Sequence, residues 1–370
     1  MKKFPELNFV TADVEQLQAE CLKLMEEYLG YPIERANPLR LLLNSLLAII
    51  IQQRLLIDEV AKMNLLAYAK GEYLERLGDL VGVERLPAAK ATTTVEVQLT
   101  AAREQATTIR RGTRITADGT IFFALDKDVI FASGETKKTC AATCTEAGEL
   151  GNNFIAGEIK QIVDVQPFLK SIVNITKSEG GADTEDDESL RDRIHEAPES
   201  FSTAGPAGAY KFWAKSTSAL ISDVAVDSPT PGEVNVYVLL KGGVLPETEM
   251  LTAVYKTLSA DTIRPLTDKV EVLAPQVESY DVDISYWINL EDQTIAAQIV
   301  EAAEAAVEEY IAWQSSKIGL DINPDELIYR LRAAGVKRIE VRSPAFKVLD
   351  KFSVAQVGDV TAEFMGVEES

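Results

Sequence analysis

The sequence predicts an α+β multidomain protein with an N-terminal helical arm, a β-rich middle domain and two small α/β sandwich domains. Its 370 residues exceed what one hydrophobic core usually organises, because typical domains hold about 100–150 residues. The spacing of apolar residues changes along the chain, from steps of three and four to strict alternation and then to a mixture of both. We therefore expect domains at residues 1–90, 91–180, 181–275 and 276–370.

Two amphipathic helices are expected in the N-terminal arm. Thr11 or Asp13 can cap the first, and Asn37 followed by Pro38 is typical of the start of the second, which continues to Ala67. The apolar stripe of the second helix is too wide for one short antiparallel neighbour to cover. Either the rest of this chain or a partner helix bundle covers it. The candidate partner interface consists of Val14, Leu17, Leu24, Tyr28, Leu42, Leu46, Ile49, Gln53, Leu56, Val60 and Met63.

A short helix at 72–81 leads into the β-rich domain. Apolar and polar residues alternate from Val95 to Leu99, and turn signals such as Asp118-Gly119 separate the runs that follow. Further strands are predicted at 113–116, 121–125, 128–131, 137–144, 158–162 and 171–175. Gly180 and Gly181 end this domain and form a candidate hinge, because glycine absorbs large changes in φ and ψ. A plain linker turn is the alternative.

The two α/β domains are predicted from strand patterns that alternate with helix patterns. The first should contain a helix opening at Gly205-Pro206, strands at 221–226, 234–239 and 269–273, and a helix at 247–259. The second should contain strands at 280–288, 336–341, 347–351 and 359–364, with helices at 291–313 and 324–334. We expect the two domains to be related sandwiches, although no repeat is evident residue by residue.

Two segments concentrate the acidic residues. In ADTEDDESLRDRI, Thr184 and Asp187 fit a capping box ahead of a helix. Calcium binding is the alternative, but the run lacks the glycine and the terminal glutamate of an EF-hand loop. In the helix predicted at 291–313, Glu301, Glu304 and Glu308 are candidates for a surface that meets basic neighbours in one assembly state only. A solvated helix face is the alternative reading of these glutamates.

Charge and composition exclude several classes of partner. With 37 Lys and Arg against 58 Asp and Glu, the net charge of -21 disfavours nucleic acid and anionic membranes. The cluster Arg110, Arg111 and Arg114 is typical of a solvated turn, and we assign it no function. The run LLLNSLLAIII at 41–51 is shorter than the about 20 residues of a membrane span, so no membrane insertion is expected. The N-terminal residues lack the apolar region of a signal peptide, which predicts synthesis in the cytoplasm.

Catalytic motifs are sparse. A single histidine excludes sites that need two imidazoles, and neither a phosphate-binding loop nor a nucleophile elbow occurs. His195 lies in a charged helix between Arg193 and Glu196, a setting typical of an exposed histidine. We therefore predict that the protein is not an enzyme and that it uses no cofactor or metal. A carboxylate-dependent hydrolase is a remote alternative, because acidic residues are abundant.

Several longer segments resemble one family when they are read in order. They are GEYLERLGDLVGVERLPAAKATTTVEVQL at 71–99, IRRGTRITADGTIFFA at 109–124, AGELGNNFIAGEI at 147–159, GGADTEDDESLRDRIHEAPESFSTAGPAGAYKFWAKS at 180–216 and IRPLTDKVEVLAPQVESYDVDI at 263–284. In this order they are similar to the baseplate J family, the wedge proteins of contractile phage tails, R-type bacteriocins and related contractile injection systems. Residues 1–70 and 286–370 match the family only in character.

The resemblance implies a structural role in a ring that surrounds the central spike and hub and rearranges to trigger sheath contraction. It implies several partners: a second copy of the chain, a smaller wedge partner bound through N-terminal helices, sheath-initiator and hub or spike proteins, and tail-fibre attachment proteins. It also implies assembly into the baseplate of a tail particle released outside the cell. A tail-associated receptor- or glycan-binding module is the alternative, which the low aromatic content of 7% disfavours.

Overall fold

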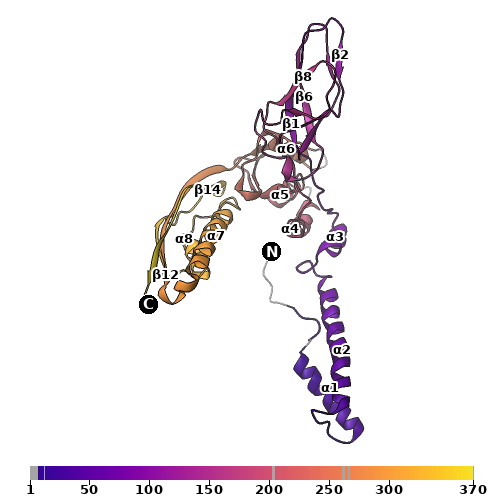
Figure 1. Cartoon of the computed structure of the whole chain (residues 1–370), viewed down its shortest axis with the longest axis vertical. Coiled ribbons are helices and arrows are strands. Elements are labelled where there is room, and N and C mark those ends of the chain that lie inside the picture. The colour runs from indigo at the N-terminus through magenta and orange to yellow at the C-terminus, as the bar shows by residue number, and fades with distance from the viewer. Residues whose placement is uncertain (1–6, 12, 202–204, 261–262, 266, 370) are drawn as a thin grey trace. The chain divides into compact units, whose positions relative to one another are not determined.

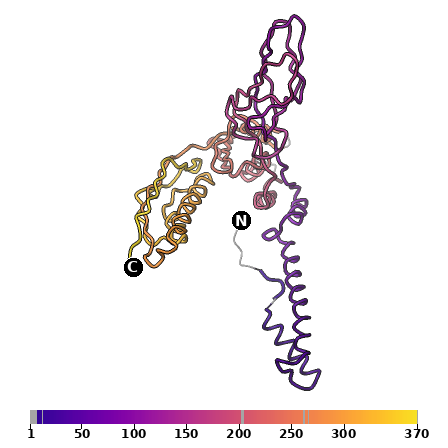
Figure 2. The backbone as a smooth tube through the Cα atoms, in the orientation of Figure 1, coloured from indigo at the N-terminus to yellow at the C-terminus, as the bar shows by residue number. Residues whose placement is uncertain are grey.

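The computed structural model describes residues 7–11, 13–201, 205–260, 263–265 and 267–369, and the chain path is drawn in Figure 1 and Figure 2. The chain divides into two compact units. The first consists of Met1–Arg85 and Asp186–Ala197, and the second of Leu86–Glu185 and Pro198–Ser370. The predicted combination of N-terminal helices with β-rich and mixed regions is confirmed.

The first unit is helical. It contains α1 (Val14–Leu29), α2 (Pro38–Lys62), α3 (Gly71–Asp79) and α4 (Asp187–Glu196). Asp13 caps α1 by accepting a hydrogen bond from the backbone N–H of Gln16, and Asn37 caps α2 toward Leu39, both at 3.0 Å. These two predicted caps are confirmed. However, α2 ends before the predicted Ala67, because the Asn64 amide donates to the carbonyl of Val60 at 3.0 Å and so satisfies the helix end.

The start of α4 corrects one prediction. Asp186, not Thr184, is the N-cap residue, and its carboxylate accepts a hydrogen bond from the backbone N–H of Ser189 at 2.8 Å. The predicted capping box is therefore wrong, because an aspartate closer to the first helical turn takes the capping position. The helix itself packs on α3, so a segment that follows the β-rich domain in sequence belongs to the N-terminal unit.

The β-rich domain is a six-stranded antiparallel sheet in the order β7-β3-β4-β6-β1-β8, with a separate pair β2-β5. The strands are β1 (Thr92–Leu99), β2 (Thr107–Ile109), β3 (Arg114–Thr116), β4 (Phe122–Leu125), β5 (Val129–Phe131), β6 (Lys137–Cys144), β7 (Gln161–Ile162) and β8 (Leu169–Asn174). Alternate residues of β1 are buried, as the sequence pattern predicts. The outer strands β7 and β8 approach each other, so the sheet nearly closes on itself.

The next domain packs helices on a three-stranded mixed sheet. It contains α5 (Ala207–Lys215), β9 (Ile221–Asp227), β10 (Glu233–Leu240), α6 (Thr248–Leu258) and β11 (Lys269–Leu273). The central strand β10 is antiparallel to β9 and parallel to β11, and α6 makes the crossover to β11. Its core includes Val236 and Val238 of the central strand, with Val254 and Leu258 of α6.

The C-terminal domain repeats this sheet pattern with longer elements. It contains β12 (Gln276–Asn289), α7 (Ala296–Gln314), α8 (Pro324–Ala333), β13 (Arg338–Ser343) and β14 (Ser353–Glu368). The central strand β12 is antiparallel to β13 and parallel to β14. The predicted strand at 347–351 is wrong. Asp321 accepts a hydrogen bond from the backbone N–H of Leu349 at 2.9 Å, and Asp350 accepts one from Phe352 at 3.0 Å, so side chains rather than a strand bind these donors.

Candidate assembly surfaces

One side of α2 exposes a row of large apolar side chains. Leu46, Ile49 and Leu56 are 51%, 57% and 52% exposed, whereas Leu47 is 3% exposed and is the buried residue of this helix. The row, which we call the α2 apolar face, comprises Leu42, Leu46, Ile49, Gln53, Leu56 and Val60. An uncovered apolar row of this length is typical of a surface that packs against another protein or membrane.

The other residues of the predicted partner interface fall into two groups. Val14, Leu24 and Tyr28 of α1 are exposed like the α2 apolar face. Leu17 is buried and Met63 is half-buried, so these two residues belong to the packing of the chain itself. The structure thus brings most of the predicted residues to the surface of one helical pair.

The C-terminal half of α2 carries charged side chains that bind the segment before α1. The carboxylate of Asp58 accepts hydrogen bonds from the backbone N–H groups of Phe9 at 2.6 Å and Val10 at 3.3 Å. Asp58 also pairs with Lys62 at 2.8 Å, and the Lys62 contact lowers the pKa of Asp58 below its usual value. Arg54 donates to the carbonyl of Thr11 at 3.0 Å. The charged part of α2 is therefore engaged within the chain, and the apolar face is not.

By length and composition, α2 is also long and apolar enough to cross a membrane. It is the one helix among the described residues of which this is true. It has 25 residues, and little of its most apolar window is buried. Helices that pack against other proteins can have the same composition. A membrane-crossing role for α2 is therefore an alternative to a protein interface.

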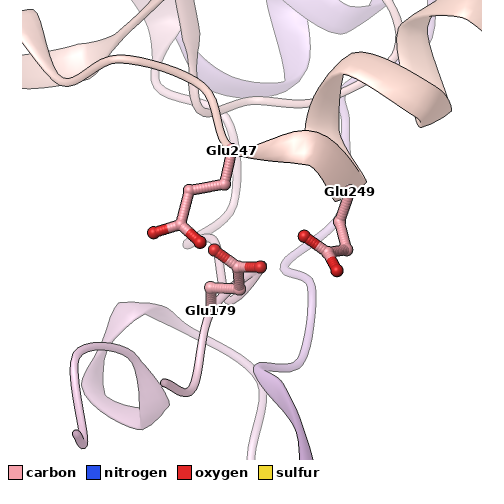
Figure 3. Close-up of side chains that lie close together, drawn as sticks. All are labelled: Glu179, Glu247 and Glu249. Carbon is pink, nitrogen blue, oxygen red and sulfur yellow. The ribbon is translucent and has the colours of Figure 1, made fainter. Parts of the chain in front are cut away.

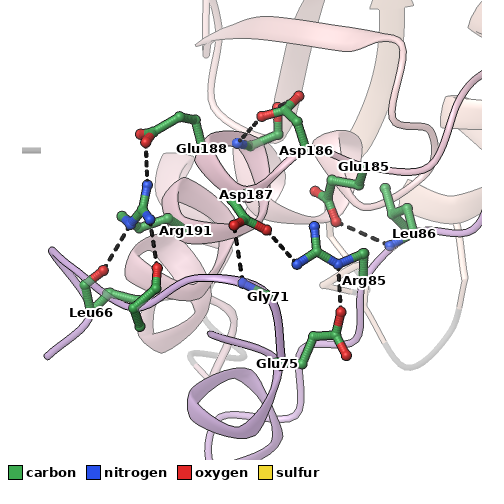
Figure 4. Close-up of polar contacts among 12 residues, drawn as sticks. Leu66, Gly71, Glu75, Arg85, Leu86, Glu185, Asp186, Asp187, Glu188 and Arg191 are labelled. Carbon is green, nitrogen blue, oxygen red and sulfur yellow. Dashed lines mark hydrogen bonds and ion pairs between the residues drawn. The ribbon is translucent and has the colours of Figure 1, made fainter. Parts of the chain in front are cut away.

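Helix α4 is attached to the N-terminal arm through Asp187 and Arg85 (Figure 4). Asp187 accepts a hydrogen bond from the backbone N–H of Gly71 at 3.1 Å and pairs with Arg85 at 2.6 Å. Arg85 also pairs with Glu75 of α3 at 2.7 Å. The Gly71 hydrogen bond and the Arg85 guanidinium lower the pKa of Asp187. Part of the acid-rich segment predicted as a helix start thus has a structural use.

A second attachment comes from the buried guanidinium of Arg191. It donates to the carbonyls of Leu66 at 2.8 Å and Ala69 at 2.7 Å, and it pairs with Glu188 at 2.5 Å. Removing a buried charged donor leaves its partners unsatisfied at a cost of about 1–3 kcal/mol for each group. These contacts fix α4 to the turn that follows α2.

The two residues of the predicted hinge have different surroundings. Gly180 has a φ of +84°, and a Cβ there would meet no atom within 4 Å. Gly181 exchanges two hydrogen bonds with the Asn152 amide, at 2.7 and 2.8 Å, and a Cβ there would lie 2.4 Å from the carbonyl oxygen of Gly148. The hinge stays a prediction. The residues on both sides of the pair are also bound, Glu179 to Thr92 and Ala182 to Ala89.

Three glutamates from two distant parts of the sequence meet beside this glycine pair (Figure 3). Glu179 approaches Glu247 and Glu249 at the start of α6, and ligand oxygens of all three lie within 4.8 Å of one another. They line a cavity of about 390 Å³ that Lys177 and Lys241 also line. The pKa of Glu179 is raised to about 8, mainly by partial burial and secondly by the contacts with the two neighbouring carboxylates. Three carboxylates fall short of the about six to eight oxygen ligands that calcium takes. The sequence does not predict this cluster, because Glu179 lies far from Glu247 and Glu249 along the chain.

The three glutamates predicted as a partner surface lie on one exposed side of α7. Glu301, Glu304 and Glu308 are exposed, and none forms an ion pair with a residue that the structure describes. Their neighbour Glu309 does pair with Arg330 at 3.0 Å. The structure therefore leaves this surface, which we call the α7 acidic face, without a basic partner in the described part of the chain.

The described histidine and cysteines lie in settings that do not suggest catalysis. His195 is exposed on α4, as predicted. Cys140 and Cys144 are buried free thiols in β6, and Cys21 is a half-buried free thiol in α1. None of these observations provides a nucleophile paired with a base.

Three family models match successive parts of the chain. The baseplate J-like protein barrel domain matches residues 96–181, the baseplate J-like central domain matches residues 202–274, and the baseplate J-like protein C-terminal domain matches residues 280–363. These matches cover the nearly closed antiparallel sheet and the two mixed α/β regions that follow it. The chain belongs to the baseplate J family, whose members are structural baseplate components of contractile tails and injection systems.

Individual relatives share about a third or less of their aligned residues with this chain. Baseplate protein J of Escherichia phage P2 is 32% identical over 164 residues, which are 43% of this chain and 52% of the relative, so the chain spans about half the length of that protein. The uncharacterized protein YqbT of Bacillus subtilis (strain 168) is 24% identical over 68% of this chain and 66% of the relative. A chain of the anti-feeding prophage baseplate, solved by cryo-electron microscopy, is 14% identical over 92% of this chain and 90% of that chain, with a TM-score of 0.42.

Proposed function

We propose that the protein is a wedge subunit of a contractile-tail baseplate, in a ring around the central hub and spike that rearranges to trigger sheath contraction. The α2 apolar face carries this proposal, because an exposed row of leucine and isoleucine is typical of a surface that another protein covers. The family match supports it independently.

The N-terminal helical pair is the part that enters a permanent contact. A large apolar helix face is typical of obligate interfaces, which are more hydrophobic than interfaces that open and close. The partners of this face are a second copy of the chain and a smaller wedge protein, which supply helices to a bundle. Sheath-initiator, hub or spike, and tail-fibre attachment proteins contact the remaining domains. After synthesis in the cytoplasm, the subunit joins a tail particle that is released from the cell.

The test replaces two exposed residues of the α2 apolar face with charged residues. We expect Leu46→Glu/Ile49→Glu, expressed in its native operon, to fold normally but to disappear from purified baseplates. Charged side chains in an apolar helical interface remain buried without partners and cost several kcal/mol. The matched control is Gln52→Glu, which adds a charge at an exposed polar position of the same helix and should assemble normally. Native mass spectrometry and negative-stain electron microscopy measure the outcome.

Two results would contradict the proposal. One is unchanged incorporation of the Leu46→Glu/Ile49→Glu variant into baseplates. The other is recovery of the wild-type chain in the membrane fraction, with loss of that fractionation in the variant, because α2 would then serve as a membrane element.

A further inference from the structure

A groove of about 600 Å³ lies beside β2, which Figure 1 places at one end of the β-rich domain. Its walls come from the segment around β2 and from the loop between β7 and β8. Arg103, Thr108, Arg110, Gln166 and Phe168 are among its lining residues. We call it the β2 groove. Two of its five named residues are arginines and one is an exposed aromatic residue, so it combines positive charge with a flat apolar surface.

Phe168 occupies a backbone position that disfavours it. In the turn from Gln166 to Leu169, the Leu169 N–H donates to the Gln166 carbonyl at 3.3 Å, Pro167 is the second residue and Phe168 the third. Phe168 has a φ of +68°, a conformation for which the third position of such turns favours glycine. A bulky residue with positive φ is an outlier, and outliers of this kind concentrate at functional sites. The conformation presents a half-exposed ring to the groove.

A guanidinium lies on that ring. The central carbon of the Arg103 guanidinium is 3.4 Å from the centroid of the Phe168 ring. Stacking orients the guanidinium and keeps its edge available, because arginine stacks through its face and donates hydrogen bonds in its plane. An arginine held this way is suited to bind a carboxylate with two parallel hydrogen bonds.

The positive charge of the groove is not neutralised by neighbouring residues. Arg114, from the same IRRGTR segment, pairs with Asp164 at 2.9 Å. Neither Arg103 nor Arg110 forms an ion pair with any residue that the structure describes. In a chain with a net charge of -21, two guanidinium groups around one groove, neither in an ion pair with a described residue, point to an acidic ligand.

We propose that the β2 groove binds the α7 acidic face of a second copy of this chain. Glu301, Glu304 and Glu308 follow helical spacing, so their carboxylates lie along one side of α7, and they too lack ion-pair partners in the described residues. In the other acid-rich segment, Asp187 and Glu188 already pair with Arg85 and Arg191 within the chain. The two unneutralised surfaces of opposite charge therefore complement each other between copies.

This contact joins two different surfaces, so it is heterologous. Heterologous contacts generate a ring when the rotation between copies closes. The inference thus rests on the proposed ring function and specifies which surfaces connect successive copies. Because both surfaces are exposed and charged, the contact should weaken as salt screens the charges, as suits an interface that must open on contraction.

Charge exchange between the two surfaces tests the inference in particles assembled from the native operon. We expect Arg103→Glu/Arg110→Glu to reduce the yield of assembled rings by about tenfold or more, because like charges across an interface repel. Glu301→Lys/Glu304→Lys/Glu308→Lys should do the same. The combination of all five substitutions should restore assembly, since the charges are exchanged rather than lost. The matched control, Lys160→Glu/Lys256→Glu, changes net charge by the same amount as the arginine variant at exposed positions outside the groove, and it should assemble normally.

A cross-link removes any dependence on the folding of the charge variants. Thr108→Cys and Glu304→Cys are placed together in a chain that also carries Cys21→Ser, and assembled particles are oxidised. Disulfide-linked multimers that neither single cysteine variant forms would support the inference. Absence of such multimers, or a five-fold variant that stays as defective as its parents, would overturn it. Wild-type rings that form normally in the same preparation show that the proposed function holds even if this contact does not.

Discussion

The helices α2 and α7 are the two longest of the described chain, and they use their apolar residues in opposite ways. Helix α7 has 19 residues, and it buries Ile299, Ala303, Ala306, Val307 and Tyr310 in the core of the C-terminal domain. Helix α2 has 25 residues and buries Leu47. The difference lies in side-chain size and in the available neighbours. The buried side of α7 includes the small residues Ala303 and Ala306, whereas α2 carries larger side chains, and α1 is the described helix that it packs against.

This difference indicates where free energy is still available for assembly. Complete burial of a leucine or isoleucine side chain contributes about 1.5–3 kcal/mol. Several side chains of the α2 apolar face are about half exposed, so covering them would contribute several kcal/mol before the entropic cost of association is subtracted. The C-terminal domain has no comparable reserve in α7, whose apolar side is already covered by its own sheet.

A buried charge in α7 should have the largest effect on the isolated chain. We expect Ala303→Asp to lower the free energy of unfolding of the C-terminal domain by about 3–5 kcal/mol, because Ala303 is 1% exposed and faces apolar residues. The neighbouring Ala302→Asp is the control, since Ala302 is exposed on the same helix. Urea denaturation followed by circular dichroism measures both. Equal effects of the two variants would show that α7 is not packed as the comparison requires.

A smaller effect should separate the two sides of α2. In the isolated chain we expect Leu47→Ala to cost about 2–3 kcal/mol and Leu46→Ala less than about 1 kcal/mol, because only Leu47 is buried. In the assembled ring, Leu46→Ala should become the more costly substitution for retention of the subunit. Thermal unfolding of the free chain and competition between tagged subunits during assembly provide the two measurements. If Leu46→Ala were as costly as Leu47→Ala in the free chain, the α2 apolar face would be covered already.

The sequence was sufficient for features that depend on neighbours within a few residues. The caps Asp13 and Asn37 and the alternation in β1 are decided locally, and they are where the pattern predicts. The excess width of the α2 stripe also follows from spacing alone, and the structure leaves that stripe uncovered.

The features that the sequence did not predict depend on contacts between distant segments. Nothing near Asp187 indicates that it pairs with Arg85, about a hundred positions earlier, so the sequence pattern places α4 in the domain that follows it. The same holds for Glu179 with Glu247 and for Arg103 on Phe168. In each case a charge or ring acquires its role only after folding has brought the segments together.

The smallest effect that we expect is a pH dependence of stability. It should distinguish the crowded carboxylates around Glu179 from the spaced carboxylates of the α7 acidic face. Because the folded chain raises the pKa of Glu179 above its ordinary value, the folded state binds a proton more tightly than the unfolded state does. The resulting stabilisation is fully present below the ordinary glutamate pKa and is lost as pH rises through about 8. Above that pH the charges of Glu179, Glu247 and Glu249 repel one another, with Lys177 and Lys241 nearby as partial compensation.

We therefore expect Glu247→Gln/Glu249→Gln to raise the melting temperature more at about pH 9 than at about pH 5, because it removes a repulsion that exists only when Glu179 is ionised. The control is Glu304→Gln, which removes one carboxylate from the α7 acidic face, where the glutamates are spaced along the helix and exposed. Its effect should differ little between the two pH values. Scanning calorimetry of the full chain at both pH values measures the difference. If the double variant gained the same melting temperature at both pH values, the three carboxylates would not repel one another in the folded chain. Glu179, Glu247 and Glu249 would then behave like the spaced glutamates of α7. The difference between the exposed apolar side chains of α2 and the buried ones of α7 would be unaffected.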